Sequence, residues 1–241
     1  MIRHLKKGIP RQIKKPFRIL ADRLLRQGEF FERQARSDLI HQAFVTLGFN
    51  AIEGDYVEFG SATATTFAHA ARASKRDRHR KRKLWAFDSF AGLPPADGPE
   101  DKHPRWIPGT MKTGIEEFKS ICRRKNITNY GIVPGFYSES LRNKSDNFFP
   151  AKSIAFIYID CDMYSSTAEV LNFILPRLQH GMIIAFDDYW CYSTDNISGE
   201  RKAFLEILKP SDKWNFEPYI QFGWSGMSFV VEYKALLPNT D

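Results

Sequence analysis

Cysteine is scarce in this sequence, and the cysteines present are far apart. Cys122, Cys161 and Cys191 are the only three, and no two of them have the Cys-x-x-Cys spacing of a zinc or redox motif. This spacing argues against a disulfide framework and against a cysteine-ligated zinc site. It is typical of a protein of a reducing compartment, so we expect the chain to be cytoplasmic.

Long apolar runs are also absent. No run approaches the roughly 18 residues that a bilayer-spanning helix needs, and no apolar stretch of a secretory signal follows the basic N-terminus. Hydrophobic residues still make up 43% of the 241 residues, and aromatic residues 14%. These proportions predict a globular chain of one domain with at most an appendage.

Positive charge is concentrated in two segments. The net charge is +7, yet residues 1–26 contribute +8 and residues 75–83 contribute +6, which leaves −7 for the remaining chain. A nucleic-acid-binding protein usually spreads its basic residues over the binding face, so we expect no nucleic-acid partner. The run 75–83 is expected to be a solvated loop.

Residues 1–50 are predicted to form a basic helical extension in front of a domain of residues 51–241. Phe17, Leu20, Leu24 and Leu25 recur at helical spacing, with basic residues between them. Three roles remain open for this extension. It packs on the domain, touches an anionic membrane surface through residues 1–26, or makes a contact in a homo-oligomer.

From residue 54 onward, strand and helix patterns alternate. Such alternation predicts an α/β protein, with a seven-stranded, mostly parallel sheet and helices on both faces. The last two strands flank a Gly-Trp-Ser-Gly turn and are expected to pair antiparallel. The predicted strands are 56–59, 84–87, 130–134, 154–159, 182–186, 216–222 and 227–233, and the helices are 63–73, 113–125, 165–178 and 200–208.

A lone glycine follows the first predicted strand, in the segment Glu58-Phe59-Gly60-Ser61-Ala62-Thr63. Glycine lets the backbone approach a ligand, and the N-terminus of the following helix attracts a carboxylate. The Gly-x-Gly-x-x-Gly cradle of a dinucleotide site is absent. A ligand with an amino-acid head group and no phosphate therefore fits this turn better.

Acidic residues end three further strands. Asp88 ends the second strand, where a carboxylate can accept both ribose hydroxyls of a nucleoside. Asp160 ends the fourth strand, and Asp187 and Asp188 end the fifth. If these two strands are neighbours, the three carboxylates converge and must bind protons or a cation. Carboxylate oxygens with waters favour a hard cation, Mg²⁺ before Ca²⁺ or Mn²⁺.

These segments together resemble the macrocin O-methyltransferase family, bacterial enzymes that methylate sugar hydroxyls of natural products. The resemblance covers roughly residues 54–190. It implies a Rossmann-like class I methyltransferase fold, S-adenosylmethionine and Mg²⁺. Ala64 departs from the family pattern, which usually has a second glycine near this position. The matching stretches are Gly-Asp-Tyr-Val-Glu-Phe-Gly (54–60), Phe-Asp-Ser-Phe-Ala-Gly-Leu-Pro (87–94), Tyr-Ile-Asp-Cys-Asp-Met-Tyr-Ser-Ser-Thr (158–167) and Asp-Asp-Tyr (187–189).

We therefore expect an O-methyltransferase that acts on a sugar hydroxyl of a small molecule or glycan. Asp160 is the predicted catalytic residue, as metal ligand and proton acceptor, and Asp162, His103 and Tyr164 are weaker base candidates. The long loop 90–110 is a candidate lid. The predicted metal ligands are Asp160, Asp187 and Asp188, and the predicted cofactor contacts are Glu58, Gly60, Ser61, Thr63, Asp88, Ser89, Tyr137, Ser138 and Asp160.

Two other functions fit parts of the sequence. Asp160-Cys161-Asp162 is an Asp-x-Asp triplet of the kind with which metal-dependent glycosyltransferases hold nucleotide-sugar phosphates. The two basic segments instead fit a nucleic-acid-binding module, although Phe17 is the only aromatic residue among their basic residues.

Overall fold

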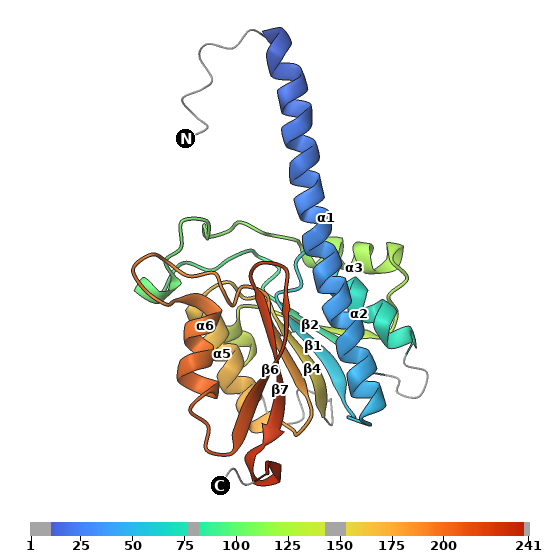
Figure 1. The fold of residues 1–241 in the computed structure, drawn as a ribbon, viewed down its shortest axis with the longest axis vertical. Coiled ribbons are helices and arrows are strands. Elements are labelled where there is room, and N and C mark those ends of the chain that lie inside the picture. The colour runs from blue at the N-terminus through green and yellow to red at the C-terminus, as the bar shows by residue number, and fades with distance from the viewer. Residues whose placement is uncertain (1–10, 77–81, 143–152, 239–241) are drawn as a thin grey trace.

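The computed structural model describes the backbone of residues 11–76, 82–142 and 153–238, and side chains from Gln27 onward (Figure 1). Residues 1–10 of the first basic segment and 77–81 of the second therefore lie outside the described part. Within the described residues, no helix is both long and apolar enough to span a membrane.

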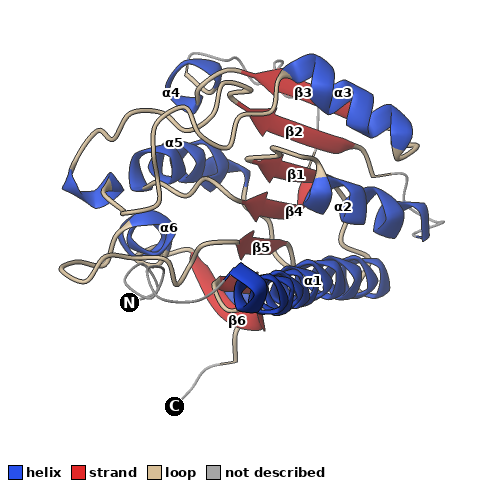
Figure 2. Ribbon diagram, turned by 90° about the horizontal axis from the view of Figure 1, so that it is seen from above, coloured by secondary structure: helices blue, strands red, loops and turns tan. Residues whose placement is uncertain are grey.

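A seven-stranded sheet in the order β3-β2-β1-β4-β5-β7-β6 forms the centre of the fold (Figure 2). The first five strands are parallel, and β7 runs antiparallel to both β5 and β6. This arrangement confirms the predicted α/β class and the antiparallel final pair. The strands are β1 (Asp55–Phe59), β2 (Leu84–Asp88), β3 (Tyr130–Pro134), β4 (Ile154–Ile159), β5 (Ile183–Phe186), β6 (Trp214–Phe222) and β7 (Gly226–Tyr233).

Helices cover both faces of the sheet. One face packs against α1 (Arg11–Phe49), α2 (Thr65–Arg76) and α3 (Ile115–Arg124). The other packs against α4 (Tyr137–Ser140), α5 (Tyr164–Ile174) and α6 (Gly199–Ala203), which continues as one π-helical turn, η4 (Phe204–Leu208). The described residues also form short 3-10 helices: η2 (Pro99–Asp101), η3 (Leu175–Arg177) and η5 (Lys234–Leu236).

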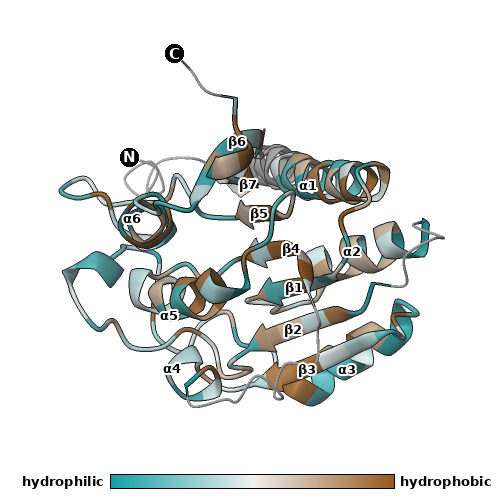
Figure 3. Ribbon diagram, turned by 90° about the horizontal axis from the view of Figure 1, so that it is seen from below, coloured by the Kyte–Doolittle hydropathy of each residue, from teal (hydrophilic) through white to brown (hydrophobic). Residues whose placement is uncertain are grey.

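The central strand β4 contributes side chains to both hydrophobic cores. Its six residues are all buried, with Ile157 and Ile159 in the α5–α6 core and Phe156 and Tyr158 in the α1–α2 core. Because successive side chains point to opposite faces, a strand covered on both sides needs an unbroken apolar run. Figure 3 shows this hydrophobic colouring on β4 and β2.

Helix α1 is 39 residues long, and its two halves differ. The second half packs on the sheet, and its apolar face is at most 3% exposed at Leu39, Ile40, Ala43, Phe44 and Leu47. The first half projects away from the domain (Figure 1). Packing on the domain, one of the three expected roles, therefore holds for the second half. Membrane contact and oligomer contact through residues 1–26 stay predictions.

Arg82 corrects the expectation that the whole run 75–83 is solvated. Its side chain is buried, and Nη1 and Nη2 donate to the carbonyl oxygens of Gly54 (2.6 Å) and Ile52 (2.7 Å). These carbonyls belong to the turn that leads from α1 into β1. A basic residue of the run therefore fixes the entry to the sheet, because the long Arg side chain reaches both carbonyl oxygens of this turn.

Arg82→Met is expected to lower the free energy of unfolding by about 2–3 kcal/mol, since two partly buried carbonyl oxygens lose their donors. Urea denaturation measures the change. Arg76→Met, at an exposed position of the same basic run, is the matched control and should stay within about 0.5 kcal/mol of the parent. Equal stability of the two variants would show that Arg82 is not a structural tether.

Candidate active site

The turn after β1 requires a glycine. Gly60 has φ +86°, and a Cβ added there would lie 1.9 Å from the carbonyl oxygen of Asp160. The N–H of Asp160 donates to the carbonyl oxygen of Phe59 at 2.8 Å. The loops that follow β1 and β4 therefore touch backbone to backbone, and this contact brings Asp160 beside the predicted cofactor turn.

Asp88, at the end of β2, organises the same turn. Its Oδ2 accepts the N–H groups of Ser61 (2.8 Å) and Ala62 (2.9 Å), and its Oδ1 accepts the N–H of Phe90 (2.6 Å). A carboxylate has about four acceptor positions, and the described residues donate three bonds to Asp88, so one position on Oδ1 remains for a ligand. Asp88 thus holds the glycine turn and keeps acceptor capacity for the predicted ribose contact.

A cavity of about 510 Å³ opens at the carboxyl ends of β1, β2 and β4. Six of the predicted cofactor residues line it, and Ser61, Thr63 and Glu58 do not. Ser61 is buried and Thr63 is exposed. The predicted residues that line the cavity are Gly60, Asp88, Ser89, Tyr137, Ser138 and Asp160.

Glu58 is fully buried behind the turn, and its side chain does not line the cavity. One carboxylate oxygen accepts the hydroxyl of Tyr56, and the other accepts the hydroxyl of Thr66 at 2.8 Å. The bond from Thr66 joins β1 to the first turn of α2. Burial raises the pKa of Glu58 to about 8.

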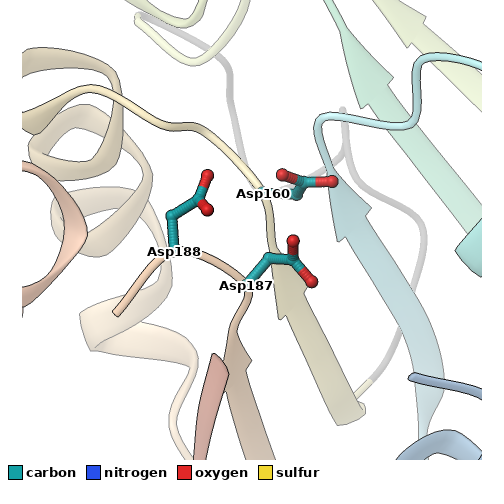
Figure 4. Close-up of side chains that lie close together, drawn as sticks. All are labelled: Asp160, Asp187 and Asp188. Atoms are coloured by element: carbon teal, nitrogen blue, oxygen red, sulfur yellow. The ribbon is translucent and has the colours of Figure 1, made fainter. Parts of the chain in front are cut away.

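Asp160, Asp187 and Asp188 converge as predicted. One carboxylate oxygen from each lies within 4.8 Å of the others, at the neighbouring ends of β4 and β5 (Figure 4). Burial, followed by the charge of Asp187, raises the pKa of both Asp160 and Asp188. The three carboxylates therefore repel one another when ionised, and a bound cation would relieve that repulsion.

Arg36 of α1 already supplies one positive charge to this cluster. Its Nε and Nη2 donate to Oδ1 and Oδ2 of Asp187, both at 2.7 Å, and its Nη1 lies 3.3 Å from Glu32. The hydroxyl of Tyr158 also donates to Oδ1 of Asp187. This side-on pair fixes the orientation of Asp187 from a position 151 residues earlier in the chain.

The donor set still fits a hard cation. All three candidate ligands are carboxylates, the donors that Mg²⁺ prefers. Asp187 Oδ1 already accepts two bonds, but Oδ2 accepts only one that the structure describes, so Oδ2 retains a lone pair. The residues that would hold the ion are therefore Asp160, Asp188 and the Oδ2 atom of Asp187.

The loop 90–110 is anchored in its middle. Asp101 in η2 is buried, and its carboxylate accepts the N–H of Ser165 (2.8 Å) in α5. Glu100 pairs with Lys202 of α6 at 3.2 Å. The ring of Trp106 packs against Gly199, where an added Cβ would lie 3.0 Å from it. The predicted lid is thus fastened to two helices beside the cavity.

The three weaker base candidates do not share the position of Asp160 between the cavity and the carboxylate cluster. The Tyr164 hydroxyl donates to Glu206 at 2.7 Å, and neither Tyr164 nor His103 lines the cavity. Asp162 does line it, in a left-handed conformation with φ +61°. Asp160 belongs both to the cavity wall and to the carboxylate cluster.

Two residues of the site were not identified from the sequence. Arg36 lies in a helix that carries many basic residues, and no local pattern separates it from its neighbours. Glu200, fully buried in α6, resembles an ordinary acid in the first turn of a helix. Both act across long stretches of chain, so only the fold brings them to the strand ends.

The strand order with its antiparallel seventh strand is that of the class I methyltransferase fold, and solved structures share it. The O-methyltransferase NovP matches with a TM-score of 0.67 over 81% of this chain and 79% of its own, at 22% identity. The calicheamicin methyltransferase CalS11 matches with a TM-score of 0.64 over 93% and 87%, also at 22% identity. Both show the predicted fold to be correct.

The chain belongs to the macrocin O-methyltransferase (TylF) family, whose sequence model matches residues 30–199. Among its relatives is the 8-demethyl-8-(2,3-dimethoxy-alpha-L-rhamnosyl)-tetracenomycin-C 4'-O-methyltransferase of Streptomyces olivaceus, 26% identical over 64% of this chain. The demethyldecarbamoylnovobiocin O-methyltransferase of Streptomyces niveus is 26% identical over 71% of this chain and 67% of its own length. The match spans 60% of the tetracenomycin enzyme.

Arg36→Met is expected to lower the free energy of unfolding of the metal-free protein by about 3 kcal/mol, because it leaves Asp187 beside two other acids without its partner. Added Mg²⁺ should recover part of this loss. Thermal or urea denaturation with and without Mg²⁺ measures both effects. Glu32→Gln breaks only the helical pair with Arg36 and should cost about 0.5 kcal/mol or less. A loss no greater than this for Arg36→Met would contradict the role of Arg36.

Glu58→Gln is expected to flatten the pH dependence of stability. Burial raises the pKa of Glu58 to about 8 in the folded protein, whereas a solvated glutamate has a pKa near 4.5. Raising the pH through this window therefore lowers the free energy of unfolding of the parent, and the variant lacks this contribution. Urea denaturation at several pH values tests it, with exposed Glu53→Gln as the control. Parallel curves for parent and Glu58→Gln would show that Glu58 is ionised throughout.

Proposed function

We propose that this chain transfers a methyl group from S-adenosylmethionine to a sugar hydroxyl of a glycosylated small molecule or glycan, with assistance from Mg²⁺. One observation carries the proposal: Asp160 lines the cavity and also belongs to the carboxylate cluster. A ligand in the cavity and a cation at the cluster would thus meet at one side chain. Family membership and the named activities of the relatives support methyl transfer to a sugar.

The residues of the cavity would hold and orient the two reactants. Asp88 would accept hydrogen bonds from the ribose, and the Gly60 turn would let the backbone approach the methionine end. S-adenosylmethionine supplies the methyl group, and Mg²⁺ supplies Lewis acidity that stabilises negative charge on the acceptor oxygen. Asp160 would take the proton of the acceptor hydroxyl.

The anchored loop 90–110 would help to exclude water from the reacting atoms. Its residues Pro94 and Pro95 line the cavity, and Asp101 fastens it to α5. Holding the acceptor oxygen at attack distance is the second large contribution that the chain itself can make.

The partners follow from this proposal. We propose a substrate that carries a sugar hydroxyl, no nucleic-acid partner and a cytoplasmic location. Peripheral membrane contact through residues 1–26 and a homo-oligomer rest on the charge and length of the helical extension alone. The family match makes methyl transfer a better account of Asp160-Cys161-Asp162 than glycosyl transfer, and thermal stabilisation by S-adenosylmethionine rather than by a UDP-sugar tests that choice.

The purified chain is expected to move radiolabelled methyl from S-adenosylmethionine onto glycosides that carry a free sugar hydroxyl, to lose this activity in EDTA and to recover it with Mg²⁺. Asp160→Asn should lower turnover by about a hundredfold or more, because it removes the proton acceptor, and should still bind S-adenosylmethionine in calorimetry. Asp195→Asn, at an exposed loop position, should behave as the parent. Full activity without a divalent cation would remove the Mg²⁺ role, and labelling of aglycones alone would exclude sugars as acceptors.

A further inference from the structure

Glu200 joins the two loops that carry the candidate metal ligands. Its Oε1 accepts the N–H of Cys161, and its Oε2 accepts the N–H of Asp188, both at 2.9 Å. Cys161 directly follows Asp160 in the chain. A single carboxylate therefore spans the gap between the loop after β4 and the loop after β5, and its side chain is fully buried.

The start of α6 is built so that Glu200 reaches this position. Gly199 has φ +59°, and an added Cβ would lie 2.9 Å from the carbonyl oxygen of Asp162. The helix therefore begins in close contact with the loop after β4. Glycine is needed at Gly199 both for this conformation and for the approach.

A carboxylate is the only natural side chain of this length that suits the two contacts. Each contact needs an acceptor, and the amide of glutamine would turn a donor toward one of the two N–H groups. Yet a fifth acid close to Asp160, Asp162, Asp187 and Asp188 adds to the repulsion in the cluster. Glu200 therefore has a geometric role, the acceptance of two N–H groups, that an uncharged residue would not fill.

We propose that Glu200 is a positioning residue that sets the spacing of Asp160 and Asp188 and thereby favours Mg²⁺ over Ca²⁺. The proposal rests on the proposed function. Mg²⁺ requires near-octahedral oxygen ligands at about 2.0–2.1 Å, whereas Ca²⁺ accepts irregular ligands at about 2.3–2.6 Å. Loosening the two loops should therefore weaken Mg²⁺ binding much more than Ca²⁺ binding.

The test is calorimetric titration of the full chain with Mg²⁺ and with Ca²⁺, without acceptor. Glu200→Asp keeps the charge but is one methylene too short to hold both N–H groups. We expect Mg²⁺ affinity to fall by about tenfold or more, in the range seen when groups behind a metal ligand are changed, and Ca²⁺ affinity to fall by less than about threefold. Glu217→Asp, an exposed change of the same kind, should change neither affinity.

A second variant distinguishes a loss of positioning from a loss of the folded structure. Gly199→Ala disturbs the start of α6 without altering any charge, and it should give the same selective loss of Mg²⁺ binding. Unchanged S-adenosylmethionine binding shows that each variant keeps its cavity. Parent-like affinity for Mg²⁺ in Glu200→Asp, or equal losses for the two ions, would overturn the positioning role. Absence of Mg²⁺ binding by the parent itself would instead refute the Mg²⁺ part of the proposed function.

Discussion

Mutual repulsion of the carboxylates at the ends of β4 and β5 is the constraint on which the rest of the site depends. The ends of β4 and β5 are neighbours in a parallel sheet, so Asp160, Asp187 and Asp188 meet within 4.8 Å. Carboxylates at such distances in a buried site need protons, a cation or a basic side chain. The long helix α1 supplies such a basic side chain, because it places Arg36 against Asp187. Its packing on the sheet thereby serves the core and the site together.

The fold could be read from the sequence because its signals are local. The apolar run of β4 and the alternation of strands and helices required only the period of the hydrophobic pattern. The strand-end acids could be placed because parallel strands bring their carboxyl ends to one edge. Glycine at Gly60 was likewise recognisable, since its φ of +86° and its 1.9 Å Cβ contact belong to a turn that the sequence marks plainly.

The remaining parts of the site depend on contacts between distant segments. Glu58 was predicted to contact the cofactor, yet strand alternation turns its side chain to the α1–α2 side of the sheet, where Tyr56 and Thr66 bind it. Arg36 and Glu200 reach the cluster only through the packing of α1 and α6. No spacing rule connects positions that lie 151 residues apart, so tertiary structure had to supply them.

The balance of charge also bears on the proposed metal site. The acids of the site outnumber Arg36, and burial raises the pKa of Asp160 and Asp162, which favours their protonated forms when no cation is bound. Cation binding and proton release are therefore linked. Only a deprotonated Asp160 can accept the proton of the acceptor hydroxyl, so cation binding at the cluster would also favour the base form that the proposed reaction needs.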